Sequence, residues 1–210
     1  MVKSVSGRKT THERTGYEQF HGDARSWDDL RVPLSSTKLG GSKDPTFSQV
    51  LNNGAGSQGV FAYLFSASQE KELYFGAQMP HNWEEGTAIH PHVHWLGGGN
   101  GGATDVCAWG LEYSLANIGE LFPNTTLVYG NEIFNADPQI IAFEHQVTEL
   151  PSIDMSGVTL SSMLICRIFR DATGAGLTDD YSDVAALVEV DFHYRINSMG
   201  SAQEYIKEPA

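Results

Sequence analysis

The chain has 210 residues, of which 40% are hydrophobic and 10% aromatic, so it is long enough to fold around a sizeable core. Its 26 acidic and 13 basic residues give a formal net charge of −13, and an acidic surface argues against DNA or RNA as a direct partner. No run of about 18 apolar residues occurs, so we expect no membrane span or membrane partner, and the first residues lack the apolar stretch of a secretory signal. Cys107 and Cys166 lie in apolar segments, which predicts buried thiols in a protein made in a reducing cytoplasm.

A basic N-terminal stretch precedes an acidic body. Residues 1–43 contain eight basic and five acidic residues, and the remainder contains five basic and 21 acidic residues. Apolar residues in the stretch follow no helical or strand period, so we expect an extended N-terminal arm that builds no element of its own. A tail whose charge has no role is the alternative. The folded body is expected over 44–210. The arm is expected to bind a neighbouring chain, or the edge of its own domain, through Tyr17, Phe20, Trp27 and Leu30.

The body is predicted to consist of strands. In the final strand, we expect Val188 and Val190 to face the core and Glu189 and Asp191 to face away from it. The strand at 60–65 is apolar on both faces and is expected to be central, and a short helical turn over 114–121 is an option. About eight strands without a convincing amphipathic helix predict an all-β fold, a jelly-roll-like β-sandwich with an extended N-terminal arm. The expected strands are 60–65, 72–79, 89–95, 105–113, 126–129, 139–147, 160–169 and 185–197.

Two loops resemble ligand sites only superficially. Residues 97–102 contain G-x-G-x-x-G, but they lead into a strand, whereas a phosphate-binding glycine loop must open a helix. A flexible hairpin loop is the better interpretation. Asp171, Asp179, Asp180 and Asp183 lack the regular spacing of a calcium loop, so we expect a solvated acidic loop there.

The most unusual stretch runs from Ile89 to Trp95, where apolar residues alternate with histidine. As a strand it places His90, His92 and His94 on one face and the apolar residues on the other. His-x-His is a common metal-ligand spacing, yet the outer two histidines would lie about 13 Å apart, so one ion would need a further segment or subunit. Two interpretations stay open: a solvated, histidine-rich sheet face, or a divalent metal site of His90, His92 and His94 at a subunit interface. No other cofactor is expected.

Enzyme signatures are missing from the sequence, which contains no G-x-S-x-G, P-loop or H-E-x-x-H motif. The nearest enzymatic resemblance is to cupins, jelly rolls whose first motif is glycine, five residues, His-x-His and then glutamate. Gly86, His92 and His94 reproduce its first part, but residues 95–102 contain no acid and the second motif is absent. A cupin centre also needs inward-facing histidines, whereas we expect outward-facing ones. We therefore expect no enzymatic activity.

A second resemblance covers most of the chain. It is carried by Trp27-Asp28-Asp29-Leu30, by Pro80-His81-x-Trp83 with Gly86 and His92-x-His94-Trp95, and by Asp191-Phe192-His193-Tyr194 with Gly200-Ser201. In these motifs the chain resembles uncharacterised structural proteins of tailed bacteriophages. The resemblance implies a β-rich, homotrimeric virion component that is synthesised in the bacterial host cytoplasm and contacts the major capsid protein or tail proteins. The first expectation is a capsid decoration (cement) protein, the second a tail or fibre/receptor-binding protein, and the third a cupin-like metal-binding protein.

Overall fold

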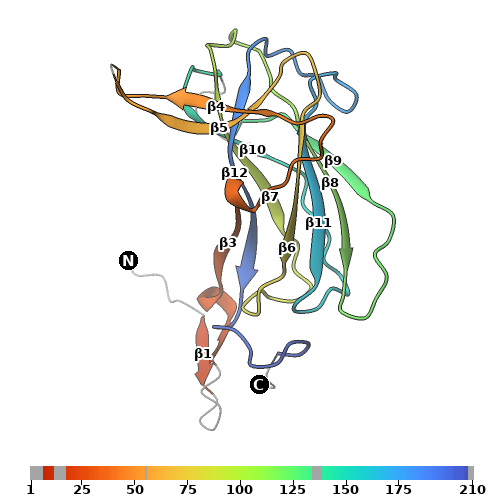
Figure 1. Ribbon diagram of the computed structural model, residues 1–210. Helices are drawn as coiled ribbons and strands as arrows, with labels where there is room; N and C mark the ends of the chain where they lie inside the picture. Colours follow the sequence, from red (N-terminus) through yellow and green to blue (C-terminus); the bar gives the residue numbers. More distant parts are fainter. Residues whose placement is uncertain (1–6, 12–17, 55, 134–138, 208–210) are drawn as a thin grey trace.

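The computed structural model describes residues 7–11, 18–54, 56–133 and 139–207, and this part of the chain is an all-β sandwich (Figure 1). The predicted fold class is confirmed. Two 3-10 turns, η1 (Gly22–Ala24) and η2 (Leu34–Ser36), are the helical elements of the described residues, and none of these residues forms a helix that could cross a membrane. The strands are β1 (Arg8–Thr11), β2 (Glu18–His21), β3 (Ser26–Pro33), β4 (Thr46–Leu51), β5 (Val60–Phe65), β6 (Glu72–Gln78), β7 (His90–Gly97), β8 (Trp109–Ala116), β9 (Thr126–Gly130), β10 (His145–Glu149), β11 (Met163–Arg170) and β12 (Ala185–Ile196).

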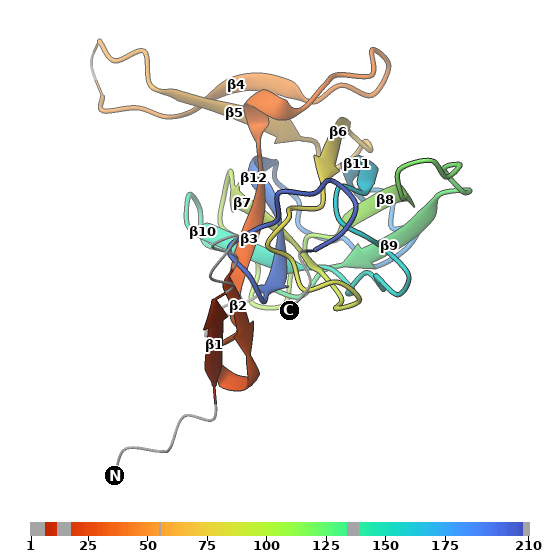
Figure 2. The ribbon, with the colours of Figure 1, turned by 90° about the horizontal axis from the view of Figure 1, so that it is seen from below.

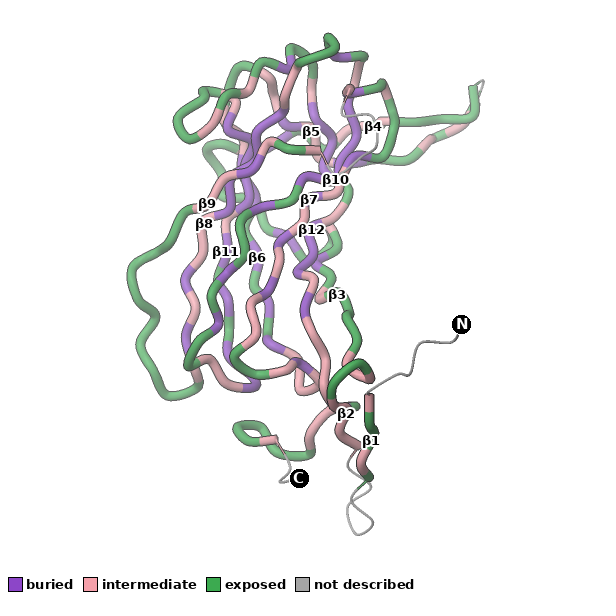
Figure 3. The backbone as a smooth tube through the Cα atoms, turned by 180° about the vertical axis from the view of Figure 1, so that it is seen from behind, coloured by how far each residue is buried: buried purple, intermediate pink, exposed green. Residues whose placement is uncertain are grey.

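Two antiparallel sheets enclose the core. One has six strands, in the order β10-β7-β12-β5-β4 with β3 also paired to β12, and the other has the order β6-β11-β8-β9. Figure 3 shows the buried residues concentrated on the strands of the two sheets. Bulky side chains fill the space between them, including the fully buried Trp95, Trp109, Phe65 and Phe192. The Cys107 and Cys166 thiols are buried, as predicted, and are not disulfide-bonded.

Strand β12 organises the larger sheet. One of its edges pairs with β7, and its other edge pairs first with β5, at residues 185–187, and then with β3, at residues 189–196. A bulge lies between Leu187 and Glu189, so Val188 has no partner on β7 and is 42% exposed. The expectation that Val188 faces the core is therefore wrong, because one extra residue shifts the alternation. Val190 and Phe192 face the core as predicted.

The N-terminal region is more ordered than predicted. Strands β1 and β2 form a hairpin beyond the end of the sandwich, and β3 joins the main sheet over eight residues (Figure 1). The expectation that this region builds no element of its own is therefore wrong. In β3, Val32 is buried and Leu30 packs against the core, so Leu30 contacts its own chain rather than standing free as a partner anchor. Phe20 is half-buried in β2, and Tyr17 lies outside the described residues.

Other boundaries also differ from the predictions. Residues 105–108 and 139–144 precede strands β8 and β10 without belonging to them, and β8 occupies the beginning of the expected helical turn at 114–121. The first half of β5 is not central, since Val60 and Phe61 are exposed. Strands β4 and β5 form a hairpin that extends away from the rest of the sandwich (Figure 2).

The acidic loop is largely structural rather than solvated. Asp171 is fully buried and accepts hydrogen bonds from the backbone N–H groups of residues 175, 176 and 177. Asp179 is paired with the fully buried Arg170, with Oδ1 2.7 Å from Nη2 and Oδ2 2.8 Å from Nε. Arg170 also donates to the carbonyl oxygen of Asp183 at 2.6 Å and to that of Tyr181. Asp171 and Asp179 are therefore structural, whereas Asp180 and Asp183 are exposed as predicted.

Candidate functional site

The histidine strand is oriented as predicted. In and beside β7, Ile89, Val93 and Trp95 are fully buried in the core. His90, His92 and His94 lie on the opposite, outer face of the six-stranded sheet and are half-buried. The strict alternation of the sequence therefore gives one strand two chemically different faces. This is the reverse of a cupin centre, whose histidines point into the barrel.

Neighbouring strands bring further polar side chains to the same outer face. On β12, Asp191 lies opposite His92 and His193 lies opposite His90. His145 comes from β10, on the other side of β7, and β3 contributes Trp27 and Asp29 from the far side of β12. We call this group the histidine face. It consists of His90, His92, His94, His145, His193, Asp29, Asp191 and Trp27.

Asp191 is the centre of the histidine face. Its Oδ1 accepts a hydrogen bond from Nδ1 of His92 at 3.1 Å, and its Oδ2 accepts one from Nε2 of His94 at 2.8 Å. Nδ1 of His94 lies 2.8 Å from Nε2 of His145. When Nε2 of His94 donates to the carboxylate and its Nδ1 carries no proton, Nδ1 can accept a hydrogen bond from Nε2 of His145. One chain of hydrogen bonds therefore crosses the three strands β12, β7 and β10.

The hydrogen bond between Asp191 and His92 shifts the pKa of each group toward its charged form. Burial raises the pKa of Asp191, but the hydrogen bonds with His92 and His94 lower it by more, to about 2. The hydrogen bond with Asp191 raises the pKa of His92, against the opposing effect of burial. Asp191 is only 6% exposed, so an ionised carboxylate is held inside a largely desolvated site by its two imidazole partners.

Trp27 closes the other side of the histidine face. Its ring lies flat on that of His193, with centroids 4.9 Å apart and an interplanar angle of 4°, and it meets His90 at 5.6 Å. Nδ1 of His193 lies 2.7 Å from Oδ1 of Asp29. Trp27 is still 50% exposed, so an indole surface is open to solvent beside the imidazoles of His90 and His193. Its predicted role as an anchor for a partner chain stays a prediction.

The geometry of a single chain does not provide a metal centre on this face. Within the described ranges, no group of three or more His, Cys, Asp or Glu side chains is arranged to hold a metal ion. The carboxylate oxygens of Asp191 are instead hydrogen-bonded to His92 and His94. A divalent ion shared by His90, His92 and His94 of several subunits stays a prediction, since the structure contains one chain.

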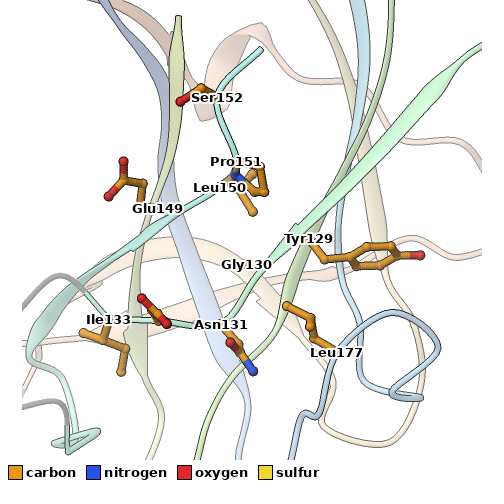
Figure 4. Close-up of a pocket in the computed structure, with 10 residues that line it drawn as sticks. Tyr129, Gly130, Asn131, Ile133, Glu149, Leu150, Pro151, Ser152 and Leu177 are labelled. Atoms are coloured by element: carbon orange, nitrogen blue, oxygen red, sulfur yellow. The ribbon is translucent and has the colours of Figure 1, made fainter. Parts of the chain in front are cut away.

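A shallow pocket of about 450 Å³ adjoins the histidine face (Figure 4). It lies between the ends of β9 and β10, and its lining combines Tyr129, Leu150 and Leu177 with the carboxylate of Glu149. Ser152 connects the two features, because it lines the pocket and its Oγ lies 2.8 Å from Nδ1 of His90. Taken together, the surface presents imidazole nitrogens, a carboxylate and aromatic rings to a ligand.

Several residues of the histidine face are not predicted from the β7 motif. His145 is isolated in the sequence, and Asp29 lies in a stretch that gives no strand signal. Asp191 and His193 do alternate on one face of the predicted final strand, which was the available signal for them. Placing them beside His92 and His90 requires the register between β7 and β12, which one sequence does not specify.

Comparison with known proteins gives only weak structural likenesses. No family model matches the chain, and no curated protein matches it. Among solved structures, the chain is similar to the CBM22-1–GH10 modules of endo-1,4-β-D-xylanase 10B from Clostridium thermocellum, complexed with xylohexaose. The sequences are 14% identical and the TM-score is 0.40, with 84% of this chain and 29% of that chain covered. A likeness of this size does not bear on function.

Proposed function

We propose that this protein is a non-enzymatic structural subunit of a bacteriophage particle and that it decorates the capsid as a cement protein. The observation that carries the proposal is the uncovered apolar surface of the β4–β5 hairpin, where Phe47 is 58% and Phe61 47% exposed and their rings lie 5.6 Å apart. Contiguous exposed apolar surface on a folded protein marks a place where another protein binds. The bacteriophage setting rests on the sequence resemblance described above.

The N-terminal hairpin supports the same proposal. Strands β1 and β2 contact the body near the end of β12, where the backbone N–H of Phe20 donates to the carbonyl oxygen of Asn197 at 2.7 Å. The rest of the hairpin extends beyond the sandwich (Figure 1). It carries Arg8 and Lys9, the latter ion-paired with Glu18 of the same hairpin, whereas the body is acidic. A basic extension is suited to lie on the acidic surface of a neighbouring subunit.

Labelling of purified particles tests the proposal. Antibody raised against the protein and coupled to gold should label the heads of purified virions, and cryo-electron microscopy should show density of matching shape on the capsid. Absence of the protein from purified particles would refute a structural role.

A truncation isolates the contribution of the hairpin. Removal of residues 1–25 takes away β1 and β2 but keeps β3, which the main sheet needs. The truncated protein should stay folded and should no longer join the particle. Normal incorporation would leave the hairpin without a role in assembly.

A second candidate function is a tail or fibre protein that binds a receptor. The histidine face favours it, because Trp27 exposes half of its surface next to polar groups that could hydrogen-bond to a ligand. Gold labelling of tails rather than heads would favour this candidate over a cement protein.

A further inference from the structure

The β4–β5 hairpin has two unlike faces. On one face, Ala62 packs with Leu96 and Ala186, and Leu34, Val50 and Leu64 cover this small cluster. On the other face lie Phe47, Phe61 and Tyr63, whose rings contact one another with centroids 5.0 and 5.6 Å apart. We call this second group the overhang; the exposed Leu51 and Val60, which pair with each other at the end of the hairpin, lie on the Ala62 face and do not belong to it.

The overhang is an extension of the core-facing side of the sheet. Tyr63 pairs with Leu187 of β12, and both belong to or pack against the main core. Further out along the hairpin, Phe47 and Phe61 are about half-exposed although they lie on that same side. Figure 2 shows the hairpin extending to one side, away from the second sheet. The sequence thus builds a core-type surface over which the described residues place no second layer.

The charge of this segment indicates what covers the overhang. Residues 46–69 contain no acidic, basic or histidine side chain, in a chain whose formal net charge is −13. Two copies of an acidic protein repel each other over most of their surfaces. A neutral, apolar segment is where they can approach without that cost, because the contact buries no charge and gains hydrophobic free energy of about 25 cal/mol per Å².

The edge of β4 favours face packing over edge pairing. The pairing of β4 with β5 shifts between Gln49 and Leu51, which places a bulge at Val50. A bulge on an edge strand hinders the addition of a further strand. The aromatic face of the hairpin is unaffected by it. A second copy can therefore pack on the apolar face of the hairpin more readily than it can add a strand to the edge of β4.

We infer that copies of this chain associate through their overhangs, with Phe47 and Phe61 of one copy packing against the overhang of the next around a symmetry axis. The same patch from each copy meets at the axis, as in an isologous interface between two copies. The inference deepens the proposed function by naming the surface through which the virion subunit self-assembles, and it rests on that function only for its biological setting.

The test measures the mass of the full chain in solution by light scattering and sedimentation over a range of micromolar concentrations. The wild type should form an oligomer, with a mass that is a whole multiple of the 23.0 kDa monomer and larger than the monomer itself. Phe47→Asp and, separately, Phe61→Asp should each give 23.0 kDa monomers, since either places a charge in the contact. Circular dichroism and thermal melting should show that both variants remain folded, because the two side chains are already about half-exposed.

Ile165→Asp is the matched control. Ile165 is 54% exposed on β11 of the other sheet, so the same change of charge on an exposed apolar strand residue should leave the oligomer intact. A wild type that is monomeric at every concentration, an oligomer that survives both phenylalanine variants, or one that Ile165→Asp dissociates equally would overturn the inference. If the protein is monomeric and still found on virions, this interface is refuted and the proposed function stands. If the protein is an oligomer but is absent from particles, the proposed function is refuted and the interface stands.

Discussion

Replacing Asp191 by asparagine tests whether its carboxylate holds the histidine face together. The pKa of Asp191 falls from 3.8 to about 2 in the folded chain: burial raises it, but the hydrogen bonds with His92 and His94 outweigh burial. Because folding lowers this pKa, the ionised carboxylate stabilises the protein above pH 3.8, and that stabilisation is lost as the pH falls towards 2. At 1.36 kcal/mol per pH unit, the contribution is about 2 kcal/mol.

His92 sets the upper limit of the pH window. Its hydrogen bond with Asp191 raises its pKa above 6.5, against the effect of burial. Folding therefore gains stability from the imidazolium below pH 6.5 and loses it as the pH rises through the pKa of the folded state. Asp191→Asn should accordingly cost most between pH 3.8 and 6.5, where both partners are charged.

Urea unfolding followed by tryptophan fluorescence measures this effect. We expect Asp191→Asn to lower the free energy of unfolding by about 2 kcal/mol at about pH 5, and by less at about pH 8 and below about pH 3. Asp29→Asn is the control on the same face: Asp29 and His193 are 48% and 37% exposed, so this pair should contribute less than about 1 kcal/mol. An equal loss at pH 5 and pH 8, or an equal loss in both variants, would refute the reasoning.

Three further predictions follow from the core. Arg170→Met should destabilise the fold by about 3–5 kcal/mol in urea unfolding, because it leaves Asp179 buried without its partner. The double variant that also carries Asp179→Leu should recover part of this loss of stability. No recovery would contradict the pairing. Gly110→Ala should lower the melting temperature, because a Cβ there would lie 2.2 Å from the ring of Phe169. Overpacking of this kind costs about 1–3 kcal/mol of stability. An unchanged melting temperature would show that the ring moves freely. Burial raises the pKa of the Cys107 thiol, so a thiol reagent should modify it only at the rate of unfolding, and rapid labelling of the native protein would contradict its burial.

The sequence predicts elements best where a strand is buried on one face or both. Alternation correctly assigned the inward and outward residues of β7, because a strand between the core and solvent needs that period. β3 lacks such a signal. Of its eight residues, Val32 alone is fully buried, since β3 lies at the margin of the sheet and its other side chains face solvent or the rim of the core. Polar strands of this kind are specified by their partner rather than by their own pattern.

The histidine face shows the same limit at the level of a site. Three of its members occupy one strand, and their spacing was sufficient to find them. The contacts of Asp191 with His92 and His94 depend on a cross-strand register that is itself shifted by the bulge beside Val188. A bulge changes which residues face each other by one position, and nothing in the sequence of β12 marks where it falls.

One edge of β12 pairs with two strands, β5 and β3, and this has a consequence for biosynthesis. Strands β3 and β5 are made early, yet both pair with β12, and β3 pairs with residues 189–196. Such long sequence separations slow folding, because the chain must close large loops before any contact is gained. During translation the β4–β5 hairpin therefore lacks its attachment to the sheet until residue 187 has left the ribosome, and the N-terminal hairpin lacks its own until residue 197 has done so. The surfaces proposed for assembly become rigid only at that stage, so a nascent chain cannot present them to completed subunits ahead of time.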